Sequence, residues 1–105
     1  MSVECYAEHR QRFRAKPVMV FNGNSLAVTP DDSTVIGIRI ADLNTPGLLD
    51  PGGEEARKRL ADVVGWQNGP VLRIATRERI GDRFLADVYV IGGNGDLVNV
   101  RELLR

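Results

Sequence analysis

The sequence predicts a mainly β domain with one or two helices, of the α+β class. Five short apolar segments rich in β-branched residues are separated by turn residues, which is the pattern of short strands. A single amphipathic segment with helical spacing lies between the third and the fourth of them. A chain of 105 residues has room for one hydrophobic core. We therefore expect one domain over residues 1–105, in which residues 1–16 form a variable N-terminal segment.

Three strands are predicted in the first half of the chain, over residues 18–21, 25–28 and 34–41, and the last of these is the longest. Asn22, Gly23 and Asn24 join the first two, because an Asn-Gly pair readily supplies the positive φ angles of a tight hairpin turn. A second turn is predicted before the third strand, where Pro30 fixes φ and the following aspartates, Asp31 and Asp32, cap nearby amides.

A helix is predicted over residues 54–65. Its apolar residues fall on one face at helical spacing: Ala56, Leu60, Val63 and Val64. Glutamates occupy the first turn, where the helix dipole favours negative charge, and Gly65 is placed to end the helix.

Two further strands are predicted over residues 71–76 and 85–90, joined by a charged loop over 77–83. A turn at 92–96 and a short extension at 97–98 precede a closing helical turn over 99–104, which Asn99 caps. Five strands with a helix after the third fit the five-stranded Greek-key barrel called the OB-fold. A half-open sandwich with one covering helix is the alternative.

The N-terminal segment carries a basic residue at every second position from Arg10 to Lys16. An extended strand would place these residues, Arg10, Arg12, Arg14 and Lys16, on one face. The apolar residues of the same segment, Val3, Tyr6, Ala7 and Phe13, also allow a short helix, and the sequence leaves both interpretations open. A basic strand face is either a solvated edge that prevents aggregation or a nucleic-acid contact.

The charge balance and the cysteine content restrict the class of protein. Basic and acidic residues number 14 each, so the overall field attracts neither nucleic acid nor an anionic membrane, and any anion site must be local. The single cysteine, Cys5, excludes an internal disulfide, and the first residues lack the layout of a secretion signal. No apolar stretch approaches membrane-spanning length. We expect a cytoplasmic protein without membrane association.

Arg39 interrupts the apolar run of residues 34–41. A guanidinium is expensive to bury unless it meets an anion, and its planar fork of donors matches carboxylate or phosphate oxygens. The residue therefore marks either an anion site or a strand end at which the arginine is ion-paired or points to water.

Five blocks of the sequence resemble, in order, successive motifs of the staphylococcal nuclease (thermonuclease) family. They cover residues 20–26, 38–47, 53–56, 82–90 and 96–99, and the resemblance extends from about Val18 to Leu104. It implies the OB-fold barrel and, in the catalytic members, a calcium-dependent phosphodiesterase that acts on single-stranded DNA and RNA.

The same resemblance points to altered catalytic motifs. Catalytic members have Asp-Gly-Asp-Thr, whose second aspartate binds calcium, where this chain has Asn24 in that position. They also have an arginine followed by Asp-Thr-Pro-Glu, whereas here Arg39 is followed by Asn44-Thr45-Pro46 and then Gly47. Their second phosphate-binding arginine matches Arg83. The implied ligand-binding set is Arg39, Arg83, Asn24, Asn44 and Thr45, with no catalytic carboxylate intact.

These exchanges should remove hydrolysis and keep anion binding. Amide oxygens are neutral, so calcium affinity should fall, and neither an amide nor a glycine accepts a proton from water. Loss of negative charge beside two arginines raises the local positive potential. We expect no metal site and no cofactor, with Arg39 and Arg83 as the remnants of the catalytic machinery.

The leading hypothesis is therefore a catalytically inactive nuclease-like domain, a pseudoenzyme, that binds a nucleotide, a single-stranded nucleic acid or another anionic ligand through Arg39 and Arg83. One alternative is an active calcium-dependent nuclease whose metal ligands lie elsewhere in the chain. A second is a protein-interaction scaffold whose arginines pair with neighbouring acids. The sequence favours the absence of enzymatic activity.

The remaining polar candidates are assigned no chemistry. Asp42, Asp82 and the turn aspartates are not expected to rebuild a metal site, and His9 and Cys5 lack partners for catalysis. Trp66 is expected to cover an end of the core. The family implies more helical structure after the fifth strand, so we expect Leu103 and Leu104, the N-terminal segment, a homo-oligomer or a protein partner to cover apolar surface there.

Overall fold

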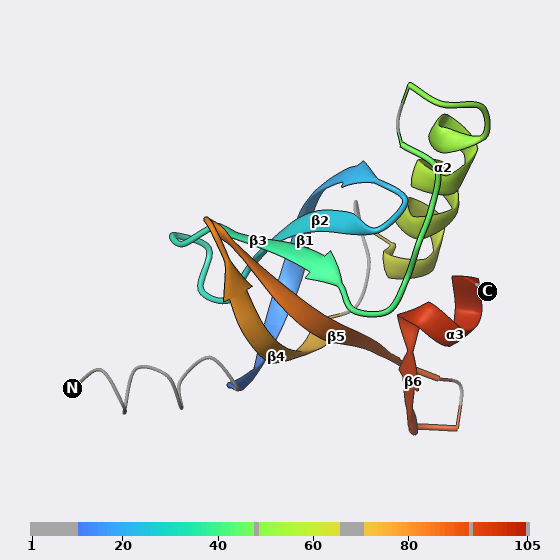
Figure 1. Ribbon diagram of the computed structural model, residues 1–105. Helices are drawn as coiled ribbons and strands as arrows, with labels where there is room; N and C mark the ends of the chain where they lie inside the picture. The colour runs from blue at the N-terminus through green and yellow to red at the C-terminus, as the bar shows by residue number, and fades with distance from the viewer. Residues whose placement is uncertain (1–10, 48, 66–70, 93, 105) are drawn as a thin grey trace.

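The computed structural model describes residues 11–47, 49–65, 71–92 and 94–104. These residues form six strands and two helices, whose arrangement is drawn in Figure 1. Their order is β1 (Arg12–Asn22), β2 (Ser25–Thr29), β3 (Ile36–Ile40), α2 (Gly53–Val64), β4 (Leu72–Ile80), β5 (Arg83–Ile91), β6 (Leu97–Asn99) and α3 (Val100–Leu104). The predicted mainly β class with two helices is confirmed. The predictions for Cys5, Tyr6, His9, Arg10 and Trp66 lie outside the described residues.

The strands form one sheet in the order β3-β2-β1-β4-β5-β6, and β3 also pairs with β5. The β3–β5 pairing is parallel, whereas the other pairings are antiparallel. The pairings therefore lead from β1 through β2, β3, β5 and β4 back to β1, which is a closed circuit of five strands. β5 serves two partners along one edge, because residues 83–86 pair with β3 and residues 89–91 pair with β6.

The sequence left a strand and a helix open for the N-terminal segment, and from Arg12 onward this segment is the strand β1. Its first part is an extended strand on which Arg12, Arg14 and Lys16 are exposed while Ala15 is buried. Alternation of this kind is what a strand with one buried face requires. Residues 12–15 pair with β4 and residues 16–22 pair with β2, so this strand of 11 residues has a different partner strand along each part of its length.

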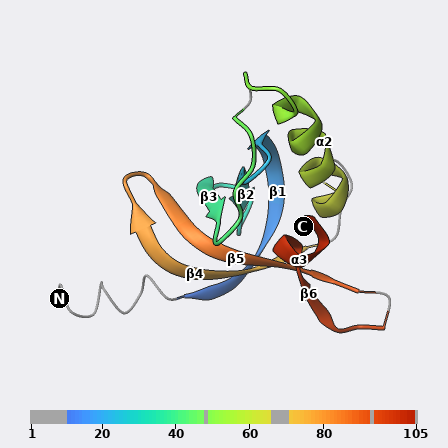
Figure 2. The same cartoon turned by 45° about the vertical axis from the view of Figure 1, so that its right-hand side comes forward.

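The core lies inside the circuit of strands and against α2. Alternate residues of the strands point inward, and α2 adds Leu60 and Val64, both with no exposed surface, and Ala61. α2 contacts β1 and α3, and both helices lie at the same end of the sheet (Figures 1 and 2). The predicted apolar face is confirmed for Leu60 and Val64. Gly65 ends the helix as predicted, with a left-handed φ of 60° and its N–H donated to Ala61 O over 2.9 Å.

Three local predictions are wrong, and the first concerns the hairpin after β1. The turn lies where it was predicted, at Gly23 and Asn24, but neither Asn22 nor Gly23 has a positive φ. The glycine is needed for space instead, since a Cβ on Gly23 would lie 2.7 Å from Ala56 Cβ and 2.8 Å from Thr45 Oγ1. The hairpin therefore packs directly against the start of α2.

The second error concerns β3, which was predicted to be the longest strand and to start at Thr34. It has five residues, and β1 is the longest strand described. Thr34 instead belongs to the preceding turn, because its N–H donates to Asp31 Oδ1 over 2.8 Å.

The third error concerns the segment predicted as a charged loop over residues 77–83. Arg77 to Ile80 continue β4 and Arg83 already belongs to β5, so the connection is the short turn at Gly81 and Asp82, with φ 61° at the glycine. The charged side chains suggested a loop, but they lie where the hairpin extends beyond the core and is solvated on both faces.

The C-terminal elements agree with prediction. Asn99 Oδ1 accepts the N–H of Arg101 over 2.9 Å at the start of α3, as a capping residue should. Leu104 packs against the core, whereas Leu103 is 49% exposed. No described helix has the length and apolar character needed to cross a membrane.

Candidate functional site

Arg39 and Arg83 lie on adjacent strands with their side chains on the outer face. β3 and β5 run parallel with Gly37 opposite Arg83, so Arg39 follows two residues later on the same face. Both arginines are exposed, while Ile38 and Ile40 are buried on the inner face. Arg39 is therefore not buried in a strand. It belongs to an outward-facing pair that the β3–β5 pairing assembles from distant parts of the sequence.

Arg83 is oriented by two neighbours. A Cβ on Gly37 would lie 3.0 Å from Arg83 Cγ, so the missing side chain makes room for the stem of the arginine. The Arg83 guanidinium lies over the ring of Phe21, with its Cζ 5.2 Å from the ring centroid. Such a contact at an exposed site is worth about 0.5–1 kcal/mol. The guanidinium is thus held near the end of β1.

Within the described residues, neither Arg39 nor Arg83 is paired with a carboxylate. Other arginines of the same sheet are paired. Arg77 donates from Nε and Nη2 to the two Asp87 oxygens over 3.0 and 3.1 Å, and from Nη1 to Asp42 Oδ2 over 3.0 Å. These bonds raise the pKa of Arg77, the bond to Asp87 contributing most. Among the described residues, Arg39 and Arg83 thus differ from Arg77 in having no carboxylate partner.

Asn24 connects the β1–β2 hairpin to the segment after β3. Its Nδ2 donates to Leu43 O over 3.1 Å, and its Oδ1 accepts the Ser25 hydroxyl over 3.1 Å. Ser25 in turn is the cross-strand partner of Arg39. The Asn24 side chain therefore uses both of its polar ends inside the protein, directly beside the strand that carries Arg39.

Asn44 and Thr45 line a hollow to which Arg39 and Arg83 do not contribute. Asn44 is exposed and Thr45 is half-buried. Both line a hollow of about 310 Å³ between residues 43–46, α2 and the end of α3, together with Glu55 and Arg59. Neither Arg39 nor Arg83 lines it, so the five predicted ligand residues do not share one pocket.

Three of the acids that could replace lost metal ligands, Asp42, Asp31 and Asp32, have other partners in the protein. Asp42 follows β3 with a left-handed φ of 60°, and its carboxylate pairs with Arg77 and with Arg101 Nη1, the latter over 3.3 Å. Asp31 Oδ1 accepts the N–H groups of the two residues after Asp32, and these bonds lower the pKa of its carboxyl. Capping by Asp31 is thus confirmed, whereas the Asp32 carboxylate lies 3.9 Å from Lys16 Nζ.

The calcium ion that the family resemblance implies does not fit the residues present. Two of the three relevant positions carry amides, Asn24 and Asn44, and the third is Gly47. The Asn24 oxygen already accepts a hydrogen bond and its nitrogen already donates one. Calcium needs six to eight oxygen ligands and favours carboxylates, so this donor set gives it no charged ligand.

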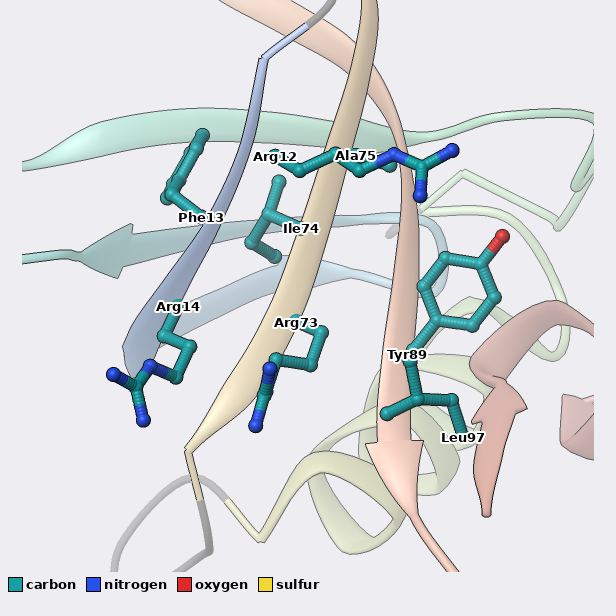
Figure 3. A pocket seen from close by; sticks show the side chains of 8 residues that line it. All are labelled: Arg12, Phe13, Arg14, Arg73, Ile74, Ala75, Tyr89 and Leu97. Carbon is teal, nitrogen blue, oxygen red and sulfur yellow. The ribbon is translucent and has the colours of Figure 1, made fainter.

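A site that the sequence did not indicate as a whole lies on the outer face of β1, β4 and β5. It is a groove of about 530 Å³, and we call it the β1–β4–β5 groove (Figure 3). The residues lining it are Arg12, Phe13, Arg14, Arg73, Ile74, Ala75, Tyr89 and Leu97. The sequence showed the alternating basic residues of β1, but Arg73 and Tyr89 become their neighbours only through the strand register. No local signal in the sequence encodes that register.

The chain was also compared with known proteins. Neither the protein-family models nor the curated proteins gave a match.

Proposed function

We propose that this protein is a nuclease-like OB-fold barrel that binds the phosphates of a nucleotide or a single-stranded nucleic acid without hydrolysing them. The closed circuit of five strands, with a helix after the third, supports the barrel part of the proposal. The family relationship itself remains a proposal based on the five sequence blocks.

The main support for the proposed binding function is the pair Arg39 and Arg83. The two guanidinium groups emerge from adjacent strands on one face, and within the described residues no carboxylate neutralises them. A pair of planar, permanently charged donors suits the oxygens of a phosphodiester. The position of Arg83 over Phe21 limits its freedom, so less conformational entropy is lost when an anion binds.

The absence of hydrolysis follows from the neighbouring side chains. Phosphodiester hydrolysis in such a site needs a positioned base or a metal-activated water. The cross-strand partner of Arg39 carries the Ser25 hydroxyl, which donates to the Asn24 amide, and neither group is a base at neutral pH. We therefore assign the arginines to binding alone.

A titration with a short single-stranded oligothymidylate tests the proposal. We expect chemical-shift changes at Arg39 and Arg83, and a salt dependence that reports their charges. Each phosphate contact to a single strand contributes about 0.7 to the slope of log K against log salt concentration, so the double variant Arg39→Gln/Arg83→Gln should lower the slope by about 1.4. Lys58→Gln, an exposed charge on α2, is the matched control and should leave the slope unchanged within about 0.3.

Two results would overturn this function. An unchanged slope in the double variant would mean that the arginines do not contact phosphate, which favours the interaction scaffold. Calcium-dependent digestion of the oligonucleotide that disappears in Arg83→Ala would instead show an active nuclease.

A further inference from the structure

The β1–β4–β5 groove concentrates positive charge that the protein does not neutralise. Arg14 lies directly opposite Arg73, and Arg12 lies two residues before Arg14 on the same face. Like charges placed directly opposite one another on neighbouring strands are destabilising. Within the described residues none of the three side chains has an acidic partner, and the solvent-shielded Nε of Arg73 has no hydrogen-bond acceptor. An anion placed between Arg14 and Arg73 would relieve the repulsion between them.

The nearest acid by register does not offset this charge. Asp87 lies on β5 opposite Ala75, which is itself opposite Arg12. Its two oxygens accept from Arg77 over 3.0 and 3.1 Å, and Arg101 Nη1 lies 3.6 Å away. Two arginines already share this carboxylate, so the groove keeps its net positive charge.

The groove also has an aromatic wall. Tyr89 is the direct partner of Arg73 on β5 and is half-buried, and Leu97 on β6 is 52% exposed at the rim. In Figure 3 the Arg14 and Arg73 side chains extend in the same direction, while Arg12 crosses β4 at Ala75 toward the Tyr89 ring. The small side chain of Ala75 leaves room for this crossing.

We propose that the β1–β4–β5 groove is a second ligand site, separate from Arg39 and Arg83, and that it takes a nucleoside diphosphate. Arg14 and Arg73 bind one phosphate as a pair, Arg12 binds the other, and the base stacks on Tyr89. The groove volume of about 530 Å³ lies within the range of small-molecule sites. Charge alone would suit any anion, whereas the ring and the apolar rim select a ligand with a flat aromatic part.

The two proposed sites are separated along β5. Arg83 is its first residue and Tyr89 lies six positions later (83 to 89), which corresponds to roughly 20 Å at about 3.3 Å per residue. Substitutions at one site therefore leave the contacts of the other intact. The failure of either proposal can be recognised without reference to the other.

ADP is the probe, because stacking on an aromatic ring accepts any base. Amide and side-chain shifts of the protein are followed during titration with ADP, AMP, adenosine and pyrophosphate. We expect ADP to shift Arg14, Arg73 and Tyr89, and AMP to bind about tenfold more weakly, since one charge-assisted contact is lost. Adenosine should not bind at millimolar concentration, and pyrophosphate should bind at least about fivefold more weakly than ADP.

Matched variants assign the contacts. Arg73→Gln and, at the more exposed position, Arg14→Gln should each weaken ADP binding about tenfold or more. Tyr89→Leu should weaken it about tenfold, whereas Tyr89→Phe keeps the ring and the affinity. Lys58→Gln, which removes an exposed charge on α2, is the control and should change ADP affinity less than about twofold. Arg14→Gln should also raise the melting temperature without ligand, because it removes the repulsion opposite Arg73.

Several outcomes would overturn the proposal. No shift at Arg73 or Tyr89 with millimolar ADP excludes the site, and equal affinities for pyrophosphate and ADP exclude recognition of the ring. Oligothymidylate that shifts these residues while ADP does not would identify a polymer-binding face instead. A stabilising Arg14→Gln variant that retains full ADP affinity would mean that the arginine pair is a structural defect without a ligand.

Discussion

The substitution Asn24→Asp tests whether the amide at this position has a structural role that an acid cannot fill. Asn24 Nδ2 donates to Leu43 O over 3.1 Å, and an aspartate would place a second carboxylate oxygen against that carbonyl. Loss of the bond removes about 0.5–1.5 kcal/mol, and the acceptor left unpaired in a half-buried position adds to the loss. We expect the free energy of unfolding to fall by about 1–2 kcal/mol near neutral pH.

Asn22→Asp provides a matched control two residues away. Asn22 Oδ1 accepts the Asn24 N–H over 3.0 Å, and a carboxylate oxygen accepts it equally well. The control adds the same charge to the same hairpin, so its stability should change by less than about 0.5 kcal/mol. A similar loss in both variants would refute the structural role of the Asn24 amide.

The pH dependence gives a second readout of Asn24→Asp. The ionised carboxylate introduced at position 24 faces a carbonyl oxygen, so its pKa in the folded protein lies above its unfolded value. A group with a raised pKa favours the folded state below the unfolded pKa, and this contribution is lost as pH rises through the folded pKa. The deficit should therefore shrink on going from about pH 7 to about pH 4. Urea unfolding followed by circular dichroism at both pH values measures it, and a deficit that grows at low pH contradicts the assignment.

Three further predictions concern packing, ion pairing and pH. Gly23→Ala should lower the free energy of unfolding by about 1–3 kcal/mol, because the new Cβ would overlap α2. A Cβ at Gly81 contacts nothing, so Gly81→Ala should lower it by about 1–2 kcal/mol through the strain of its left-handed φ of 61° alone. Thermal unfolding that ranks Gly81→Ala as the more damaging change would contradict this reading. A double-mutant cycle of Arg77→Gln with Asp87→Asn should give a coupling of about 0.5 kcal/mol that falls in about 1 M salt, and a coupling insensitive to salt would argue against ion pairing. The Asp31 carboxyl should titrate below its ordinary value of 3.8 in an NMR titration, since backbone N–H groups donate to its ionised form. Its contribution to stability is present at higher pH and is lost as pH falls through the lowered pKa, and a midpoint at or above 3.8 would show that the cap does not form.

The features that the sequence predicted well are those with a local cause. The span of α2 follows from the spacing of Leu60 and Val64, and Gly65 and Asn99 act as caps because their chemistry favours those positions. Neighbouring residues determine each of these features, so no knowledge of distant contacts was needed.

The features that the sequence did not predict depend on distant partners. β1 is long because β2 and β4 both pair with it, and residues 78–80 lie in a strand because β5 continues opposite them. Likewise Arg14, Arg73 and Tyr89 form one row only in the folded register. The side-chain bonds of Asn24 were missed for the same reason, since Leu43 reaches it only after β3 has folded back.

The closed circuit of strands has a consequence for how the protein is made. β1 pairs with β4, and β3 pairs with β5, across long stretches of chain, and such non-local pairings form slowly because loop-closure entropy is lost before contacts are gained. A nascent chain on the ribosome therefore has its arginines but neither of the two proposed anion-binding surfaces until β5 has emerged. An anion that binds only the folded protein raises its free energy of unfolding, by about 2.7 kcal/mol at a concentration one hundred times its Kd. A higher cellular concentration of such an anion would therefore slow proteolysis of the folded protein.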